Sequence, residues 1–457
     1  MSKFTYIDLF AGCGGLSEGF SQSDLFEGVA HVEWELPMVE TLRQRLVDTW
    51  DYSVKEATAS VIHFDIQKTN ELIQGTWSDE TKSLYGETND QCIQEIGLNG
   101  MIGDRVIDVV IGGPPCQAYS IAGRAQDKNS MKDDYRNYLF ESFIKVVDHF
   151  QPKLFVFENV PGILTAKPGD ELVIERIYKA FAEIGYQIKR PEKLKEAMYT
   201  ATDFGVPQKR NRIIIIVVRN DLNLDLEQVY AEVDKQKDCI ATTVFDAIGT
   251  LPKLLPLSKP KKINRKNVSH EQEKGTAEVA LHTPRYHNPM DVKIFSQWIQ
   301  DNMNTLPTVE KIAFYNNLKC KNSNHAKYRN LEWNQPSPTI VAHLYKDGLM
   351  FIHPDVEQAR SITIREAALL QSFPLDYNFL GSAGYCYKMI GNAVPPLMAK
   401  KIAIGLGHFL NDKNLQSSNM VEKIPSHNDG LQITLELEPT KRMNILVECE
   451  ERQAESK

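Results

Sequence analysis

The stretch FTYIDLFAGCGG (residues 4–15) begins with an apolar run and ends in a glycine-rich turn. Residues 4–10 are expected to form a buried β-strand, because a continuous apolar run is typical of a strand that is covered on both faces. Residues 11–15 allow a tight turn, since glycine adopts backbone conformations that other residues avoid, and residues 16–21 begin a helix. At such a strand–turn–helix junction a nucleotide-like ligand can approach the backbone closely.

The same alternation of strand and helix continues to about residue 220. Apolar segments predict further strands at residues 28–32, 61–64, 106–111, 154–157 and 212–218, and helical periodicity covers residues 39–47, 138–150 and 173–184. Buried strands that alternate with helices predict an α/β fold with a doubly wound, mostly parallel sheet. In such sheets ligands bind at the carboxyl ends of the strands. The residues that follow the strands are therefore expected to line one edge of the sheet: Gly12, Glu33, Asp65, Cys116 and Glu158.

The second half of the chain loses this alternation. Residues 252–287 are basic and weakly periodic, so a second, irregular domain is expected there. Helical patterns return at residues 361–372 and 397–410. The connection at residues 67–105 is longer than a normal loop, which indicates an insertion with a role of its own. The tail at residues 413–457 contains alternating apolar residues, and both a hairpin and a disordered tail fit this pattern.

Composition argues against several classes of protein. Hydrophobic residues make up 42% and charged residues 25% of the 457-residue chain, as in an ordinary globular protein. No apolar run approaches the ~20 residues of a membrane helix, and the N-terminus lacks the pattern of a signal peptide. A cytoplasmic protein with no membrane partner is therefore expected. The seven cysteines contain no Cys-x-x-Cys pair, which argues against both a zinc site and a disulfide framework.

The net charge of −8 conceals a basic segment. Residues 247–270 contain no acidic residue and include Lys261, Lys262 and Arg265. Such a run is either a solvated surface or a contact surface for phosphate groups, and charge alone leaves both interpretations open.

The glycine turn and the next two strand ends suit an adenosine ligand better than a pyrophosphate. The spacing is Gly-x-Gly-Gly, and Ser17 occupies the place of the third glycine of the dinucleotide fingerprint. Glu33 can accept hydrogen bonds from a pair of ribose hydroxyls, Trp34 can stack on adenine, and Asp65 can accept from an exocyclic amine. Each residue taken alone is as readily a capping carboxylate or a core aromatic. Their order along the strands favours the adenosine interpretation.

Cys116 follows two glycines and two prolines in the stretch GGPPC (residues 112–116). Proline fixes the backbone in front of the thiol, and a buried structural cysteine needs no such mount, so a nucleophile is indicated. Glu158, at the end of the neighbouring strand, offers a general acid. Arg210 and Arg212 would bring positive charge to the same edge, which favours a thiolate.

Six segments of the chain, in order, resemble the motifs of the DNA (cytosine-5)-methyltransferases. They are DLFAGCGG (residues 8–15), GPPCQ (113–117), ENV (158–160), QKRNR (208–212), residues 360–374 and GNAVPP (391–396). One such match could arise by chance, whereas six in the same order indicate the family. The resemblance implies the Rossmann-like fold of S-adenosylmethionine-dependent methyltransferases, with a second domain that recognises DNA.

The resemblance also implies roles for the site residues. Cys116 would add to C6 of cytosine, and Glu158 would hold or protonate the ring N3. Arg212 would contact the ring carbonyl oxygen, with Arg210 supporting the site. The methyl donor would be S-adenosylmethionine, and no metal would be needed. The cofactor-side positions of the family correspond to Phe10, Gly12, Gly14, Glu33, Trp34, Asp65, Pro115 and Asn392.

For the DNA, the resemblance implies that the target cytosine is flipped out of the duplex, because the base is inaccessible in the stack. Residues 118–136 fit a loop that closes over the flipped base, and a plain surface loop is the alternative. The residues expected to contact DNA are Gln117, Arg124, Lys261, Lys262 and Arg265.

The domain division follows from the same resemblance. Residues 1–220, completed by residues 376–412, would form the catalytic and cofactor-binding domain. Residues 221–375 would form the target-recognition domain with its buttressing helix, and residues 413–457 a C-terminal extension. The expected substrate is a specific double-stranded DNA sequence, methylated by a monomer in the bacterial cytosol or nucleoid. Protection from a cognate restriction endonuclease is the expected setting.

Three other interpretations compete with this one. A tRNA cytosine-5 methyltransferase shares the motif order, but that branch typically carries a Cys-Phe-Thr tripeptide, which is absent here. A non-enzymatic, DNA-binding relative is disfavoured because Cys116, Glu158 and Arg212 are all present. A nicotinamide-dependent dehydrogenase is disfavoured by the Gly-x-Gly-Gly spacing.

Overall fold

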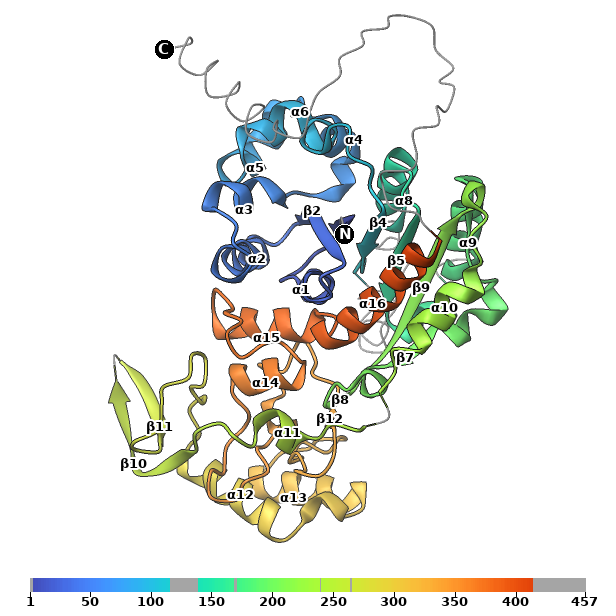
Figure 1. Ribbon diagram of the computed structural model, residues 1–457. Helices are drawn as coiled ribbons and strands as arrows, with labels where there is room; N and C mark the ends of the chain where they lie inside the picture. The colour runs from blue at the N-terminus through green and yellow to red at the C-terminus, as the bar shows by residue number, and fades with distance from the viewer. Residues whose placement is uncertain (1–2, 116–138, 168–170, 239, 264, 414–457) are drawn as a thin grey trace, which may run out of the picture.

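The computed structural model describes residues 3–115, 139–167, 171–238, 240–263 and 265–413. The chain forms a layered α/β body with a smaller second part beneath it (Figure 1). Among the described helices, none combines the length and the apolar character that crossing a membrane requires.

One eight-stranded sheet forms the centre of the body, in the order β3-β2-β1-β4-β5-β9-β6, with β7 paired to β9. The strands are β1 (Phe4–Leu9), β2 (Phe26–Glu33), β3 (Val61–His63), β4 (Val109–Gly112), β5 (Leu154–Asn159), β6 (Tyr186–Gln187), β7 (Met198–Thr200) and β9 (Asn211–Arg219). Strands β1 to β5 pair in parallel, whereas β9 runs antiparallel to β5 and to β6 and β7. The predicted α/β fold with a mostly parallel sheet is confirmed.

Helices flank this sheet on both faces (Figure 1). They are α1 (Gly15–Gln22), α2 (Leu36–Thr49), α3 (Val54–Ser60), α4 (Thr69–Gln74), α5 (Asp79–Tyr85), α6 (Gln91–Ile102), α8 (Leu139–Phe150), α9 (Val173–Glu183), α10 (Leu226–Asp234) and α16 (Pro396–Asp412). Helix α15 (Ala383–Asn392) packs instead in the core of the second part. The predicted insertion at residues 67–105 contains three of these helices, α4, α5 and α6. The sequence pattern showed neither these short helices nor α15.

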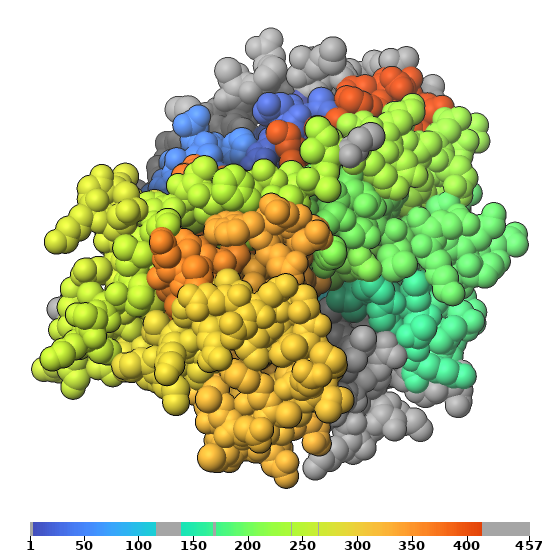
Figure 2. Space-filling view, turned by 90° about the horizontal axis from the view of Figure 1, so that it is seen from below, coloured from blue at the N-terminus to red at the C-terminus, as the bar shows by residue number. Residues whose placement is uncertain are grey.

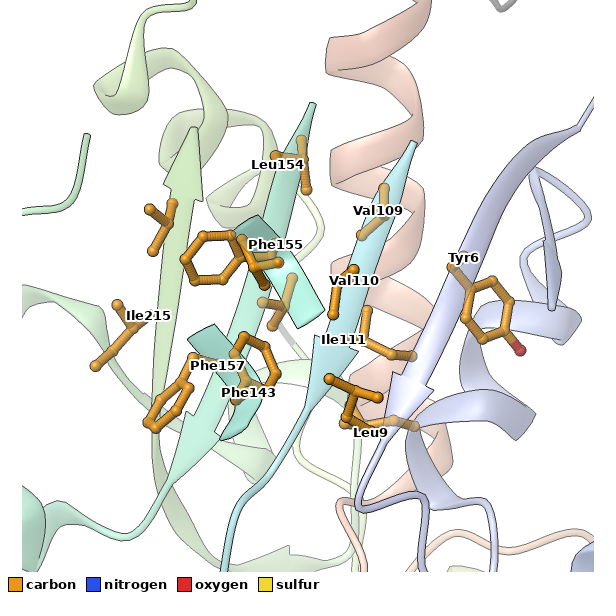
Figure 3. Packing of buried hydrophobic residues seen from close by; sticks show 14 of the residues in the cluster. Tyr6, Leu9, Val109, Val110, Ile111, Phe143, Leu154, Phe155, Phe157 and Ile215 are labelled. Atoms are coloured by element: carbon orange, nitrogen blue, oxygen red, sulfur yellow. The ribbon is translucent and has the colours of Figure 1, made fainter. Parts of the chain in front are cut away.

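The core lies between the central strands and the helices that cover them. The apolar segments of β4, β5 and β9 are fully buried, as their continuous apolar sequences predict. Figure 3 shows β4 between β1 and β5, with the ring of Phe143 from α8 against β5. The ring centroid of Phe143 lies 5.6 Å from that of Phe155 and 5.4 Å from that of Phe157. These contacts hold the carboxyl ends of β4 and β5 in fixed positions.

The two ends of the described chain meet where α1 packs against α16 (Figure 1). Gly15 and Gly19 make this contact close, because a Cβ at either position would collide with the backbone of residues 394–400. The GNAVPP segment therefore lies beside the first glycine turn, which brings residues 391–394 to the same edge of the sheet.

The second part consists of short elements with little regular order. They are β8 (Gln208–Lys209) with its parallel partner β12 (Ser337–Pro338), α11 (Val244–Ile248), the hairpin β10 (Leu254–Ile263) and β11 (Lys266–Gln272), α12 (Pro289–Gln300), α13 (Thr308–Lys319) and α14 (Ile364–Leu370). The expectation of an irregular second part agrees with this arrangement.

The predicted domain borders do not coincide with the packing. Helix α10 contributes Val229 and Val233 to the core of the body, although residues 221–375 were assigned to the second domain. Conversely, Tyr377 and Met389 pack in the core of the second part. By packing, the first border lies after α10 and not at residue 220, and the second lies after Met389 and not at residue 376. Which residues recognise DNA stays a prediction.

The basic hairpin β10–β11 projects from one side of the molecule (Figure 1). Lys261, Lys262 and Arg265 are all exposed on it. In the view from below it lies at the margin of the molecule, beside the gold surface of α12 and α13 (Figure 2). Exposure of three cations suits a contact with phosphate groups, and their contact with DNA stays a prediction.

Candidate active site

A cavity of about 620 Å³ opens at the carboxyl ends of β1 to β5, the edge where the sequence predicts a site. Its size is within the range of small-molecule sites. Nine of the predicted site residues line it: Phe10, Gly12, Glu33, Trp34, Asp65, Pro115, Glu158, Arg212 and Asn392. Gly14 and Arg210 do not line it.

The turn after β1 is held in an unusual backbone conformation. Phe10 has φ 60° and Gly12 has φ 58°, both in the left-handed region. This region costs a residue with a side chain roughly 1–2 kcal/mol, so strain at Phe10 is stored beside the cavity. Gly14, with φ 87°, shares this left-handed conformation and also allows close packing, because a Cβ there would collide with Leu42 of α2.

Glu33 joins the first two loops of the edge through its carboxylate. Oε2 accepts from the backbone N–H of Gly12 at 2.8 Å, and Oε1 accepts from those of Trp34 at 2.8 Å and Glu35 at 2.7 Å. Burial raises the pKa of Glu33, and the three backbone donors oppose this rise. A carboxylate has about four acceptor positions, so one position on Oε2 remains for a ligand. The two hydroxyls of a ribose would have to share this position, which limits the expected acceptance of hydrogen bonds from both.

Trp34 and Asp65 follow β2 and β3 at the same end of the cavity. Trp34 is 55% exposed although it lines the cavity, and its indole forms a side-chain hydrogen bond with Tyr85. The carboxylate of Asp65 accepts from the backbone N–H of Gln67 at 3.0 Å and keeps acceptor capacity on its second oxygen. An exposed indole beside two carboxylates is a suitable set of partners for a purine nucleoside.

At the opposite end of the cavity, Glu158 and Arg212 form an ion pair. Glu158 Oε1 lies 2.8 Å from Arg212 Nε, and both side chains are largely buried. Burial raises the pKa of Glu158, whereas the guanidinium groups of Arg212 and Arg210 lower it, and the net direction is upward. A carboxyl group with a raised pKa next to a cation can hold or transfer a proton.

The family model of the C-5 cytosine-specific DNA methylases matches residues 4–408. The chain belongs to this family. It is a DNA (cytosine-5)-methyltransferase, and enzymes of this family generally use S-adenosylmethionine. The family is one of DNA methylases, so the tRNA alternative is not favoured.

Two bacterial relatives of the methyltransferase align over most of their length. Type II methyltransferase M.Bpa9945I of Bacillus paralicheniformis is 34% identical over 458 residues, which cover 89% of this chain and 99% of the relative. Type II methyltransferase M1.HphI of Haemophilus parahaemolyticus is 32% identical over 412 residues, which cover 88% of this chain and 86% of the relative.

A solved structure shows the same fold. It is the crystal structure of a protein described as a DNA modification methyltransferase encoded within an E. coli prophage, with a TM-score of 0.59 and 22% identity. The match covers 90% of this chain and 100% of the prophage protein.

Arg210 of the methyltransferase does not line the cavity but bonds to the backbone of its wall. It is fully buried, and its guanidinium donates to the backbone carbonyls of Ile340 at 3.1 Å and of Gly391 and Ala393 at 2.9 Å each. Gly391 and Ala393 flank Asn392 in the cavity wall. Arg210 therefore holds this wall in position, whereas Arg212 faces the cavity.

Two buried glutamines, which sequence reasoning missed, complete this support. Gln208 accepts from the N–H of Ile340 at 2.9 Å and donates to Gln371, and Gln371 donates to the carbonyl of Ala393 at 2.6 Å. Both glutamines lie inside segments that resemble family motifs, residues 208–212 and 360–374. Membership of these motifs was the one sequence feature that could have indicated them. Their roles depend on contacts across more than 160 residues of sequence.

Several predicted site residues lie outside the described residues. They are Cys116, Gln117 and Arg124, together with the rest of the loop expected at residues 118–136. The tail at residues 414–457 lies outside them as well. Pro115, which precedes Cys116, is described and lines the cavity, and the carbonyl of Pro114 accepts from Asn159 Nδ2 at 3.3 Å. Within the described part of the chain, no cluster of three His, Cys, Asp or Glu could hold a metal ion.

Gly113 gives a first testable prediction for the site. A Cβ at this position would lie 2.6 Å from Glu158 Oε2, so alanine would displace the carboxylate. We expect Gly113→Ala to lower kcat by about tenfold to a hundredfold, because small displacements of a catalytic group are costly. Methyl transfer at saturating DNA and cofactor measures this. Gly384→Ala, where a Cβ meets only ordinary contacts of 3.8 Å, is the matched control. An unchanged kcat in Gly113→Ala would contradict the close approach of Gly113 to Glu158.

Proposed function

We propose that the cavity binds S-adenosylmethionine and that the enzyme methylates C5 of cytosine within a specific double-stranded DNA sequence. The observation that carries this proposal is the content of one cavity. Adenosine-type partners, Glu33, Trp34 and Asp65, line one end, and the Glu158–Arg212 ion pair lines the other. A single site of this kind can hold a nucleoside cofactor beside an acid and a cation.

The residues of the cavity fit this cofactor. Glu33 retains an acceptor position, Trp34 offers an exposed ring, and Asp65 Oδ2 retains acceptor capacity beside its 3.4 Å hydrogen bond from Gln67 Nε2. Gly12 allows a ligand to approach, since a Cβ at this position would meet only Met38 Sδ, at 4.0 Å. When bound, S-adenosylmethionine supplies an electrophilic methyl group on its sulfonium.

We assign the chemistry on cytosine to the other end of the cavity. The Cys116 thiolate adds to C6, which moves the C5–C6 electron pair onto C5 and makes C5 nucleophilic. Glu158 holds or protonates N3, where negative charge develops, and Arg212 binds the ring carbonyl oxygen. After C5 has been methylated, loss of the C5 proton restores the double bond and expels the thiolate of Cys116.

The substrate must reach this site as an extruded base, since C6 is inaccessible inside a duplex. We assign phosphate contacts to Lys261, Lys262 and Arg265 of the exposed hairpin, and closure over the base to Gln117 and Arg124. The bacterial Type II relatives support protection from a restriction endonuclease as the biological role. We assign this role to a monomer in the bacterial cytosol.

The test is transfer of tritium from labelled S-adenosylmethionine to unmethylated plasmid DNA, followed by bisulfite sequencing of the product. We expect label at cytosine C5 within one short sequence, and none with Cys116→Ala. Transfer RNA of the same host, supplied at equal cytosine concentration, should take up no label. Label on RNA alone, or DNA labelling that survives in Cys116→Ala, would contradict the proposal.

A further inference from the structure

The insertion at residues 67–105 lies directly behind one wall of the cavity. This wall is formed by Trp34 and by residues 64–67, which follow β3. The rings of Trp77 and Tyr85, both from the insertion, pack on Phe64 with centroid distances of 4.7 and 5.3 Å. The insertion therefore lines the cavity only with its first residue, Gln67, among the described residues, and its helices contact the wall from outside.

His63, the last residue of β3, holds the peptide unit that follows Trp34. The backbone N–H of Trp34 donates to Glu33 Oε1 at 2.8 Å, and the backbone carbonyl of Trp34 lies 2.9 Å from His63 Nε2. A carbonyl only accepts, so Nε2 must carry the proton. The Trp34 backbone is thus held from both sides, by Glu33 and by His63.

Thr88 of the insertion completes this chain of contacts. Its Oγ1 lies 2.7 Å from His63 Nδ1. Burial lowers the pKa of His63, the hydrogen bond to the Trp34 carbonyl opposes this, the positive charge of Arg43 adds to the lowering, and the net direction is downward. The lowered pKa favours the neutral imidazole, in which Nδ1 accepts the proton of the Thr88 hydroxyl. The same hydroxyl lies 3.0 Å from the carbonyl of Tyr85, an alternative acceptor if His63 becomes charged.

Asn89 and Arg43 fix the insertion to the edge of the sheet. Asn89 Oδ1 accepts from the backbone N–H of His63 at 2.9 Å, and its Nδ2 donates to the carbonyl of His63 at 2.8 Å. This side chain satisfies the edge strand in place of another strand. Arg43 of α2 donates to the carbonyl of Thr88 at 2.8 Å and to that of Val61 at 3.0 Å.

We propose that the insertion sets the adenine end of the cofactor pocket, with Thr88 orienting His63 and His63 orienting the Trp34 loop. Thr88 and His63 are positioning residues, because neither contacts the cavity. The inference rests on the proposed binding of S-adenosylmethionine there. It gives the long connection at residues 67–105 a function that neither its composition nor the family motifs indicate.

The experiment compares binding of S-adenosylhomocysteine, by isothermal titration calorimetry, to the full-length enzyme and three threonine variants. Thr88→Val removes the hydroxyl at constant shape, and Thr88→Ser retains it. Thr58→Val on α3 is the matched control, because the Thr58 hydroxyl bonds only within its own helix, to the carbonyl of Val54. We expect Thr88→Val to weaken binding about three- to tenfold, as loss of one hydrogen bond does, and Thr88→Ser and Thr58→Val to bind like the wild type.

Kinetics separate positioning from a general loss of structure. KM for S-adenosylmethionine should rise in Thr88→Val, while kcat and the affinity for DNA stay at the wild-type values. His63→Leu should weaken cofactor binding at least as much, and His63→Gln, which retains an N–H donor, should recover part of it. Wild-type affinity in Thr88→Val, or a parallel loss of DNA affinity, would overturn the inference. Failure of the wild type to bind S-adenosylhomocysteine would instead refute the proposed cofactor site.

Discussion

Glu158→Gln should lower kcat for methyl transfer by about 10²- to 10⁴-fold, the usual contribution of a general acid. Glutamine keeps the shape of the side chain and an oxygen that accepts from Arg212, whose Nε lies 2.8 Å from Glu158 Oε1. It cannot give up a proton to the cytosine ring. The loss therefore isolates proton transfer from positioning, and the affinity for DNA and for S-adenosylhomocysteine should stay within about twofold of the wild type, since neither requires this proton.

The pH dependence gives a second measure of the same group. Burial raises the pKa of Glu158, and the protonated form is the one that acts as an acid. Wild-type kcat/KM should therefore fall as pH rises through this raised pKa, and Glu158→Gln should lack that decline. Single-turnover transfer over a range of pH measures both enzymes. Glu141→Gln on α8, at an exposed residue, is the control. A Glu158→Gln enzyme with wild-type kcat would remove Glu158 from the mechanism.

The edge of the sheet that holds the site could be predicted because it depends on strand ends. Continuous apolar runs locate β1, β2, β4 and β5, and in a parallel sheet their carboxyl ends must share an edge. Gly12, Glu33 and Glu158 lie there for that reason. The direction of β9 could not be predicted in the same way, because buried strands have the same continuous apolar sequence in parallel and in antiparallel pairs.

The supports of the site could not be predicted, because they depend on contacts between distant segments. Sequence spacing does not show that Arg210 bonds to carbonyls about 130 and 180 residues away. Neither does it show that Thr88 lies against His63, since the intervening insertion carries no strong periodicity. The direction of the Arg210 side chain depends on the positions of the backbone carbonyls that accept from its guanidinium. These positions are known only from the folded structure.

Arg210→Met should cost about 2–6 kcal/mol of the free energy of unfolding, because it removes the donor from buried carbonyls. Methionine has a similar length, but it leaves the carbonyls of Ile340 and Gly391 without this donor, whereas the carbonyl of Ala393 keeps its hydrogen bond from Gln371. Each unsatisfied buried carbonyl costs about 1–3 kcal/mol. Urea unfolding measures the loss. Lys209→Met, the same change at the exposed neighbouring residue, should stay near the wild type.

Loss of stability alone would not show that Arg210 holds the cavity wall, so the binding of S-adenosylhomocysteine to the folded fraction is measured as well. The Arg210 guanidinium fixes the carbonyls on both sides of Asn392, which lines the cavity. We expect weaker binding in Arg210→Met and an intermediate loss in Arg210→Lys, because a single ammonium cannot span carbonyls in three directions. Wild-type affinity in a folded Arg210→Met protein would mean that the Gly391–Ala393 wall keeps its shape without the guanidinium. Arg210 would then stabilise the fold without positioning the site.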